Sequence, residues 1–190
     1  MSDQEQSDIQ RAWYQEHFAI QRSIKYHTRR QAFYDSWNNI TNAVSILLGA
    51  GTVAASAHAL RLADVLSVVF PIVITIFSTL NLVWGTTRRA RLHNELYRRF
   101  IELERRMVSS SVVDAHACRI FRGERLAIEA DEPPTMFVLR ILCHNEVVRA
   151  HGAGEYFRVP LWQRCLAHLW RFADARFADA GFTPARRNVT

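Results

Sequence analysis

Two long apolar runs, separated by only a few residues, limit the fold of this chain more than any other feature. The runs cover residues 40–60 and 65–84, and only Arg61 and Asp64 carry formal charge from the start of one to the end of the other. A bilayer core of about 30 Å is crossed by about 20 mostly apolar helical residues, so each run is long enough to span it. Because the connection is so short, the second helix must turn back along the first. The sequence therefore predicts a transmembrane helical hairpin.

The charges beside the two runs predict its orientation. Basic residues precede the first run and follow the second, whereas the turn between the runs is nearly neutral. The positive-inside rule then places both termini in the cytoplasm, with the protein crossing the membrane more than once. We expect seven flanking side chains to anchor the hairpin at lipid headgroups: Arg29, Arg30, Trp37, Trp84, Arg88, Arg89 and Arg91.

The rest of the chain is polar and predicted to be helical. The mean hydropathy of the 190 residues is −0.10, because the apolar residues are concentrated in the two runs. We expect an all-α membrane protein in which long cytosolic helical extensions of the hairpin form a helical bundle. The net charge of +6 then suits anionic headgroups, and nucleic acid is not an expected partner. The expected parts are a cytosolic N-terminal helix (1–37), the hairpin (38–87), a cytosolic stalk and bundle (88–180) and a loose tail (181–190).

Local signals place the helix ends. Ser7 and Gln10 form a capping-box pair, which marks a helix start that leads without Pro or Gly into the first apolar run. The second membrane helix is expected to continue directly into a basic stalk over residues 88–107, which carries helical Glu–Arg pairs. Later helices are expected over residues 112–130, over 136–150 with Thr135 as N-cap, and over 161–178.

A stripe of small and polar residues runs along the predicted hairpin. In the first helix these residues recur every three or four positions, which places them on one helix face. Two interpretations stay open: a weakly polar pore lining in an oligomer, or close helix packing through small residues. The candidate lining or packing residues are Asn42, Ser45, Gly49, Thr52 and Ser56 in the first helix and Ser78 and Asn81 in the second.

Catalytic and metal-binding patterns are not found in the sequence. The run Cys143-His144-Asn145-Glu146 holds a thiol, an imidazole and a carboxylate, but neighbouring helical positions point in different directions and cannot converge alone. We expect the polar members to cross-link helices instead. The three cysteines are widely spaced and form no zinc-ligand pattern. The sequence thus predicts no enzyme, no cofactor and no metal; a membrane-tethered cysteine enzyme is the weakest alternative.

The assembled pattern resembles the SLATT family. The resemblance is carried by the aromatic, basic N-terminal segment HFAIQRSIKYHTRRQAFYDSW, the small-residue hairpin, the basic segment RRARLHNELYRRFIELERRM and the later segment LCHNEVVRAHG. SLATT domains are two-transmembrane effector modules of bacterial conflict systems, often encoded beside nucleotide-second-messenger synthases or SLOG sensors. The resemblance implies a bacterial inner-membrane location and an antiviral defence role, and offers no catalytic residues.

Two functions are compatible with these sequence features. The first is a pore-forming or membrane-perturbing effector of a bacterial defence system. It is expected to be homo-oligomeric, because two helices alone enclose no water path. Its expected partners are the lipid bilayer, further copies of the chain and a sensor or second-messenger-system protein. The alternative is a non-conducting, membrane-anchored adaptor whose cytosolic helices bind a partner protein.

Overall fold

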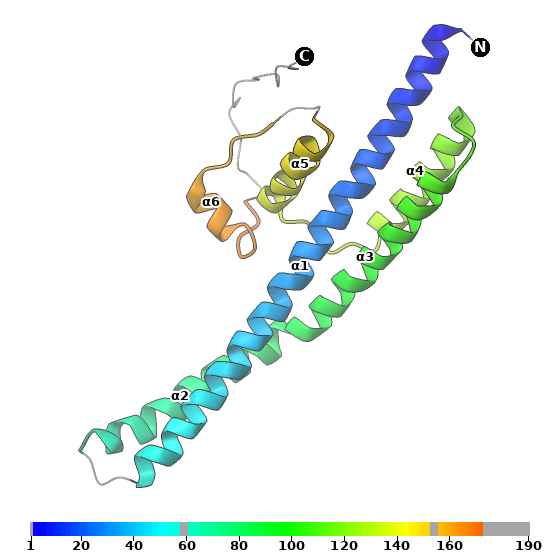
Figure 1. The fold of residues 1–190 in the computed structure, drawn as a ribbon. Coiled ribbons are helices and arrows are strands. Elements are labelled where there is room, and N and C mark those ends of the chain that lie inside the picture. The colour runs from blue at the N-terminus through cyan, green and yellow to red at the C-terminus, as the bar shows by residue number, and fades with distance from the viewer. Residues whose placement is uncertain (1, 58–60, 153–155, 173–190) are drawn as a thin grey trace. The chain divides into compact units, whose positions relative to one another are not determined.

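All secondary structure that the computed structural model describes is helical, which confirms the all-α prediction (Figure 1). The description covers residues 2–57, 61–152 and 156–172, without the side chains of 54–57, 61–64, 66, 67 and 84. The helices are α1 (Asp3–Ala57), α2 (Arg61–Trp84), α3 (Thr86–Ser109), α4 (Ala115–Glu129), α5 (Phe137–His151) and α6 (Leu161–Leu166).

The chain divides into two compact units. The hairpin unit is residues 30–93, and the bundle unit is residues 1–29 together with 94–190. The hairpin expected over residues 38–87 falls within the first of these units. Helix α1 contributes to both, because its 55 residues run without interruption through the border between them.

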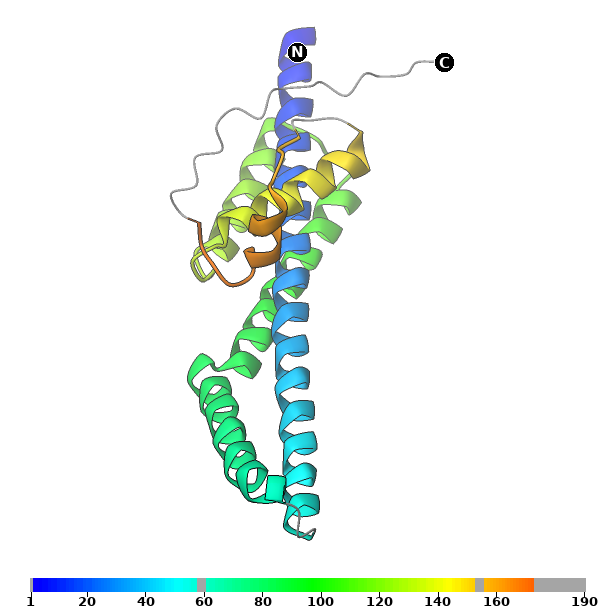
Figure 2. The same cartoon turned by 90° about the vertical axis from the view of Figure 1, so that its left-hand side faces the viewer.

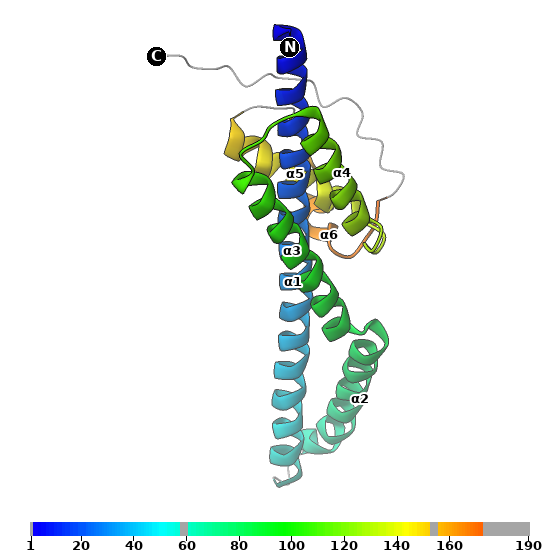
Figure 3. The ribbon, with the colours of Figure 1, turned by 90° about the vertical axis from the view of Figure 1, so that its right-hand side faces the viewer.

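In the hairpin unit, the last part of α1 and α2 lie side by side and run in opposite directions (Figures 2 and 3). The two helices approach closely at Gly51, where an added Cβ would lie 2.9 Å from the Phe70 ring. The outer surface of the pair is apolar: Ile46, Leu47 and Val83 are each more than two-thirds exposed. Such a surface requires lipid or a protein partner to cover it.

One helical stretch among the described residues, Val68–Ser109, contains an 18-residue window apolar and long enough to cross a membrane. None of that window is buried inside the protein, unlike the core helix of a soluble fold. The first apolar run ends among residues whose side chains lie outside the description. The structure therefore gives one helix with the properties of a membrane span.

The prediction that the second apolar helix continues into the basic stalk is wrong, because the helix is interrupted at Gly85. Helix α2 ends at Trp84 and α3 begins at Thr86, and Gly85 between them has a positive φ of 55°. The Gly85 N–H donates to the carbonyls of Asn81 and Leu82, each at 3.2 Å, as at other glycine C-caps. The basic segment is therefore a helix of its own.

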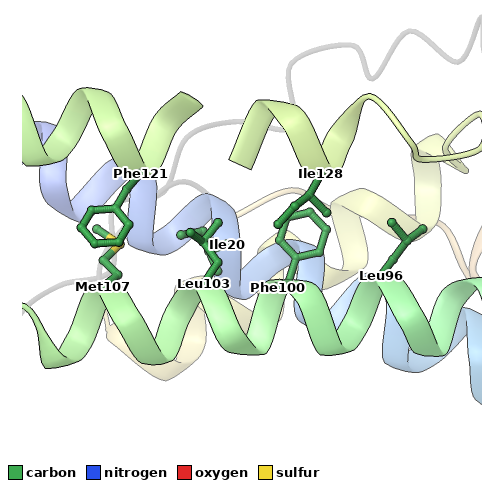
Figure 4. Packing of buried hydrophobic residues seen from close by; sticks show 7 residues of the cluster. All are labelled: Ile20, Leu96, Phe100, Leu103, Met107, Phe121 and Ile128. Atoms are coloured by element: carbon green, nitrogen blue, oxygen red, sulfur yellow. The ribbon is translucent and has the colours of Figure 1, made fainter. Parts of the chain in front are cut away.

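The bundle unit has an apolar core between α1, α3 and α4. Phe100 and Leu103 of α3 and Ile20 of α1 are completely buried. Figure 4 shows the α3 side chains pointing toward Phe121 and Ile128 of α4, with Ile20 among them. A second cluster joins α1 to α5, and its buried members are Tyr26, Val138, Leu139, Cys143 and Ala167. The bundle thus packs like an ordinary soluble helical domain.

Several helix ends differ from those predicted. Helix α1 begins at Asp3, because the Ser2 hydroxyl accepts from the Glu5 N–H at 3.2 Å, and Ser7 instead donates to a backbone carbonyl inside the helix. Helix α4 begins at Ala115, after Asp114 accepts from the Ala117 N–H at 2.6 Å. Helix α5 begins after Met136, which replaces the expected cap Thr135.

The end of the chain holds less regular helix than expected. Helix α6 spans only Leu161–Leu166, shorter than the predicted 161–178, and turns follow it. The remaining part of that predicted helix, from residue 173, and the predicted tail lie outside the described residues. Helix α5 ends at His151, one residue beyond the predicted end, and is followed by Gly152 with a φ of 65°.

Candidate functional site

A polar groove opens between α1 and α2 in the hairpin unit, next to the break at Gly85. Its volume is about 440 Å³. Helix α1 contributes Asn42 and Ser45, and α2 contributes Ser78 and Asn81. The structure thus brings together four of the seven predicted stripe residues, from both apolar runs, in one cavity. Its other lining residues are Thr41, Leu82, Gly85, Thr86, Thr87 and Arg88.

One side of the groove is held by a chain of hydrogen bonds. The Asn81 amide donates to the Asn38 side-chain oxygen at 3.3 Å, and its own oxygen accepts from the Thr86 hydroxyl at 2.5 Å. Thr41 donates back to the carbonyls of Trp37 and Asn38 at 3.1 and 2.9 Å, and only 4 % of its surface is exposed. These bonds link α1, α2 and the start of α3 through polar groups.

The other polar groups of the groove are left without protein partners. Among the described residues, the side chains of Asn42, Ser45 and Ser78 form no hydrogen bond. In water this costs nothing, because solvent replaces the missing partner. In a bilayer each such group costs free energy unless water or another subunit reaches it. In a bilayer, the groove is therefore the part of the hairpin whose polar groups need water or another subunit as hydrogen-bond partner.

The remaining stripe residues lie elsewhere. Gly49 does not line the groove, and a Cβ added there would meet nothing within 4 Å. The Thr52 hydroxyl donates to the Leu48 carbonyl one turn earlier, at 2.9 Å. The side chain of Ser56 lies outside the described residues. The close helix contact is made by Gly51, one residue that the three-and-four spacing passes over.

Two of the predicted headgroup anchors contact Tyr34. The Arg30 guanidinium lies 4.6 Å from the centre of the Tyr34 ring and donates to its hydroxyl, and Arg30 is only 5 % exposed. Arg89 approaches the same ring at 6.0 Å and its hydroxyl at 3.5 Å. The His93 ring stacks on the Tyr34 ring, with ring centres 5.8 Å apart. This cluster gives Tyr34 a packing role that the sequence did not reveal.

The other predicted anchors have varied surroundings. Arg29 pairs with Glu146 in the bundle unit, and Trp37 packs against Phe33. Arg88 and Arg91 are exposed, and Arg88 also lines the groove. The Trp84 side chain lies outside the described residues. A headgroup role for these side chains stays a prediction.

Sequence reasoning missed Asn38, Thr41 and Thr86. A signal for Asn38 was present, because Asn38, Asn42 and Ser45 continue the same helical spacing by one turn toward the N-terminus. Thr86 could not be placed, since it reaches the groove only because the chain breaks at Gly85. The groove thus extends beyond the stripe on the side of Gly85, and residues of three helices line it.

The four residues of the run from Cys143 to Glu146 contact different partners. Cys143 is fully buried, and this burial raises the pKa of its thiol to about 12. The His144 ring packs edge-on against Phe18 at 5.0 Å. Asn145 and Glu146 cross-link helices or loops, as predicted: Asn145 bonds the Phe157 backbone and Glu146 pairs with Arg29.

Three of the seven arginines of the basic helix α3 pair with carboxylates of the bundle unit. Arg99 contacts Asp131 at 2.7 Å, and Arg106 forms two bonds to Glu124 at 3.0 and 2.5 Å. Arg105 pairs with Glu102 within the helix, and this bond lowers the pKa of the Glu102 carboxyl. These arginines are already engaged and do not form an open charged surface.

Comparisons with family models, with curated proteins and with solved structures give no match. Within the described part of the chain, no group of three His, Cys, Asp or Glu side chains is placed to hold a metal ion. The candidate site is therefore defined by its own geometry: a groove that gathers several polar side chains, between helices whose outer surface is apolar.

Proposed function

We propose that the protein is a membrane-embedded, homo-oligomeric effector whose hairpins assemble around the polar groove. As its resemblance to SLATT domains implies, it would act by perturbing or perforating the inner membrane of a bacterium, in a defence role. Both apolar runs would cross the bilayer, with both termini in the cytoplasm. Several subunits are needed, because one pair of helices has no lumen.

One observation carries this proposal: unpartnered polar side chains share a cavity in an otherwise apolar hairpin. Asn42, Ser45 and Ser78 line the same groove, and the exposed apolar side chains lie on the outside of the same helices. Lipid suits the outer surface, but not the groove. Facing the groove toward a shared axis would give these three groups water, while leaving Leu47 and Val83 in hydrocarbon.

The same arrangement would also suit a tightly packed oligomer that does not conduct. In that case the polar groups would bond across the subunit interface instead of contacting water. Conduction and packing make opposite predictions for the groove, so the test must report water or ion passage. A signal received by the bundle unit, from a sensor or second-messenger-system protein, would then control opening.

The test is ion flux from liposomes that contain the purified protein, compared with Ser45→Trp. We expect the wild-type protein to give ion flux. In Ser45→Trp the flux should fall to near the protein-free background, because the indole fills a cavity of about 440 Å³ that both helices line. Leu47→Trp is the matched control: it adds the same group two residues away, at a side chain that is 71 % exposed.

Equal suppression by both tryptophans would contradict the assignment of the groove as the ion path. No flux from inserted wild-type protein in any condition, including with its cellular trigger, would favour the adaptor. The adaptor alternative has less support, because, of the α3 arginines within residues 98–106, Arg99, Arg105 and Arg106 already pair within the bundle unit and only Arg98 is left exposed without such a pair among the described residues.

A further inference from the structure

A second cavity, in the bundle unit, gathers arginines from four parts of the chain. It lies between α5, α6 and the segment that joins them, and its volume is about 380 Å³. Its charged lining residues are Arg29 from α1, Glu146 and Arg149 from α5, Arg158 from the joining segment and Arg164 from α6. We call this cavity the arginine pocket.

The fold builds this pocket through Asn145. The Asn145 amide donates to the Phe157 carbonyl at 2.6 Å, and its oxygen accepts from the Phe157 N–H at 2.9 Å. Asn145 is only 3 % exposed, so these two bonds fix the joining segment to α5 in a water-poor setting. The segment then presents Arg158 beside the arginines of the helices.

The charges of the pocket's described lining residues do not balance. Glu146 is the only carboxylate among its described lining residues, and it pairs with Arg29. Arg149 donates to the neutral Tyr156 hydroxyl at 2.6 Å and lies 5.3 Å from the centre of that ring. Arg158 and Arg164 form no side-chain hydrogen bond or ion pair among the described residues. Three guanidinium groups therefore repel one another around one cavity.

We propose that the arginine pocket binds a small anion that carries two or more phosphate groups. A phosphate group carries up to two negative charges and accepts the paired bonds that a guanidinium donates. Two such groups match three uncompensated arginines better than a single carboxylate does. The volume lies in the range of small-molecule sites, and Leu142, Val159 and Leu161 give it an apolar wall for an organic part.

The same chemistry is offered by soluble diphosphates and by a lipid headgroup with two phosphates. The experiment is isothermal titration of the full chain in nanodiscs of zwitterionic lipid with inorganic pyrophosphate. A parallel arm compares nanodiscs with and without cardiolipin. It measures whether cardiolipin competes with pyrophosphate for the pocket and whether it raises the protein's melting temperature. We expect one pyrophosphate per chain; a response to cardiolipin alone, lost in the variant below, would assign the same pocket to a headgroup.

The diagnostic variant is Arg158→Gln with Arg164→Gln, two exposed side chains that form no side-chain hydrogen bond or ion pair with the described residues. We expect binding to weaken roughly tenfold or more, because each charge-assisted phosphate contact is among the strong hydrogen bonds. Arg98→Gln with Arg119→Gln is the matched control: it makes the same change in net charge on exposed side chains outside the pocket. The control is expected to bind like wild type.

Glu146→Gln gives the opposite sign and so cannot be explained by misfolding. It removes the one carboxylate and releases Arg29, and should tighten binding by roughly threefold. Circular dichroism confirms that each variant is folded. The proposal is overturned if neither probe binds the folded wild-type protein, or if both double variants bind equally. It does not depend on conduction, because binding is measured without ion flux.

Discussion

The hairpin unit and the bundle unit are both helical, but they expose different kinds of side chain. In the bundle, Phe100 and Leu103 are fully buried, while charged groups such as Arg106 and Glu124 pair on the surface. In the hairpin, Leu47 and Val83 are exposed, while polar groups line the groove between the helices. The difference teaches that the surface of the bundle suits water, whereas the surface of the hairpin needs lipid or a protein partner to cover it.

The largest expected effect is at the bundle core, which should behave like that of a soluble domain. Phe100→Ala removes a fully buried ring that stacks on His27, with ring centres 5.5 Å apart. We expect a loss of about 3–5 kcal/mol in the free energy of unfolding, from lost burial and a cavity. Denaturant unfolding of the bundle, followed by circular dichroism, measures it. A loss below about 1 kcal/mol would show that this core is loosely packed.

The next effect tests the outer surface of the hairpin. Ile46→Arg places a charge on a side chain that is 71 % exposed. If that surface faces lipid, insertion becomes less favourable by about 2.5–3.5 kcal/mol. The measurement is the fraction of protein that stays in the membrane after alkaline extraction. Unchanged extraction would mean that this face lies in water, and the two units would then share one solvent.

The smallest effect concerns a single helix end of the bundle. Asp114→Ala removes the side chain that caps α4, whose carboxylate accepts from the Ala117 N–H at 2.6 Å. We expect a loss of about 1 kcal/mol, since water satisfies part of the freed N–H. Thermal unfolding measures it. Asn145→Ala is the reference for a buried polar contact, and we expect it to lower the free energy of unfolding more than Asp114→Ala. A larger loss for Asp114→Ala would contradict this order.

The sequence predicted the broad plan because helical periodicity and run length are local properties. The separate helices before and after residues 131–135 and four of the groove residues followed from run length and spacing. The break at Gly85 was missed, although glycine is the residue that most readily takes a positive φ. Its presence shortens α2 and turns the basic segment into a separate helix.

The parts that could not be predicted depend on residues far apart in the chain. Arg29, Arg149 and Arg164 meet in one pocket only because α1, α5 and α6 pack together. Asn145 was visible in the sequence, but its partner is the backbone of Phe157, which carries no residue-specific signal. Likewise, Gly51 lies against Phe70 only because α1 and α2 pack together. Such contacts are tertiary, and no periodicity encodes them.

The most direct test of the central claim is the accessibility of spin labels in reconstituted protein. Labels are placed at Leu47→Cys and Val83→Cys on the outer surface and at Ser45→Cys and Ser78→Cys in the groove, in a Cys165→Ser background. Cys165 is the exposed one of the free thiols, whereas Cys118 and Cys143 are buried. We predict that oxygen, which concentrates in lipid, relaxes the outer labels, and that a water-soluble nickel chelate relaxes the groove labels. Equal access of the chelate to all four positions would contradict a hairpin with lipid outside and water in its groove.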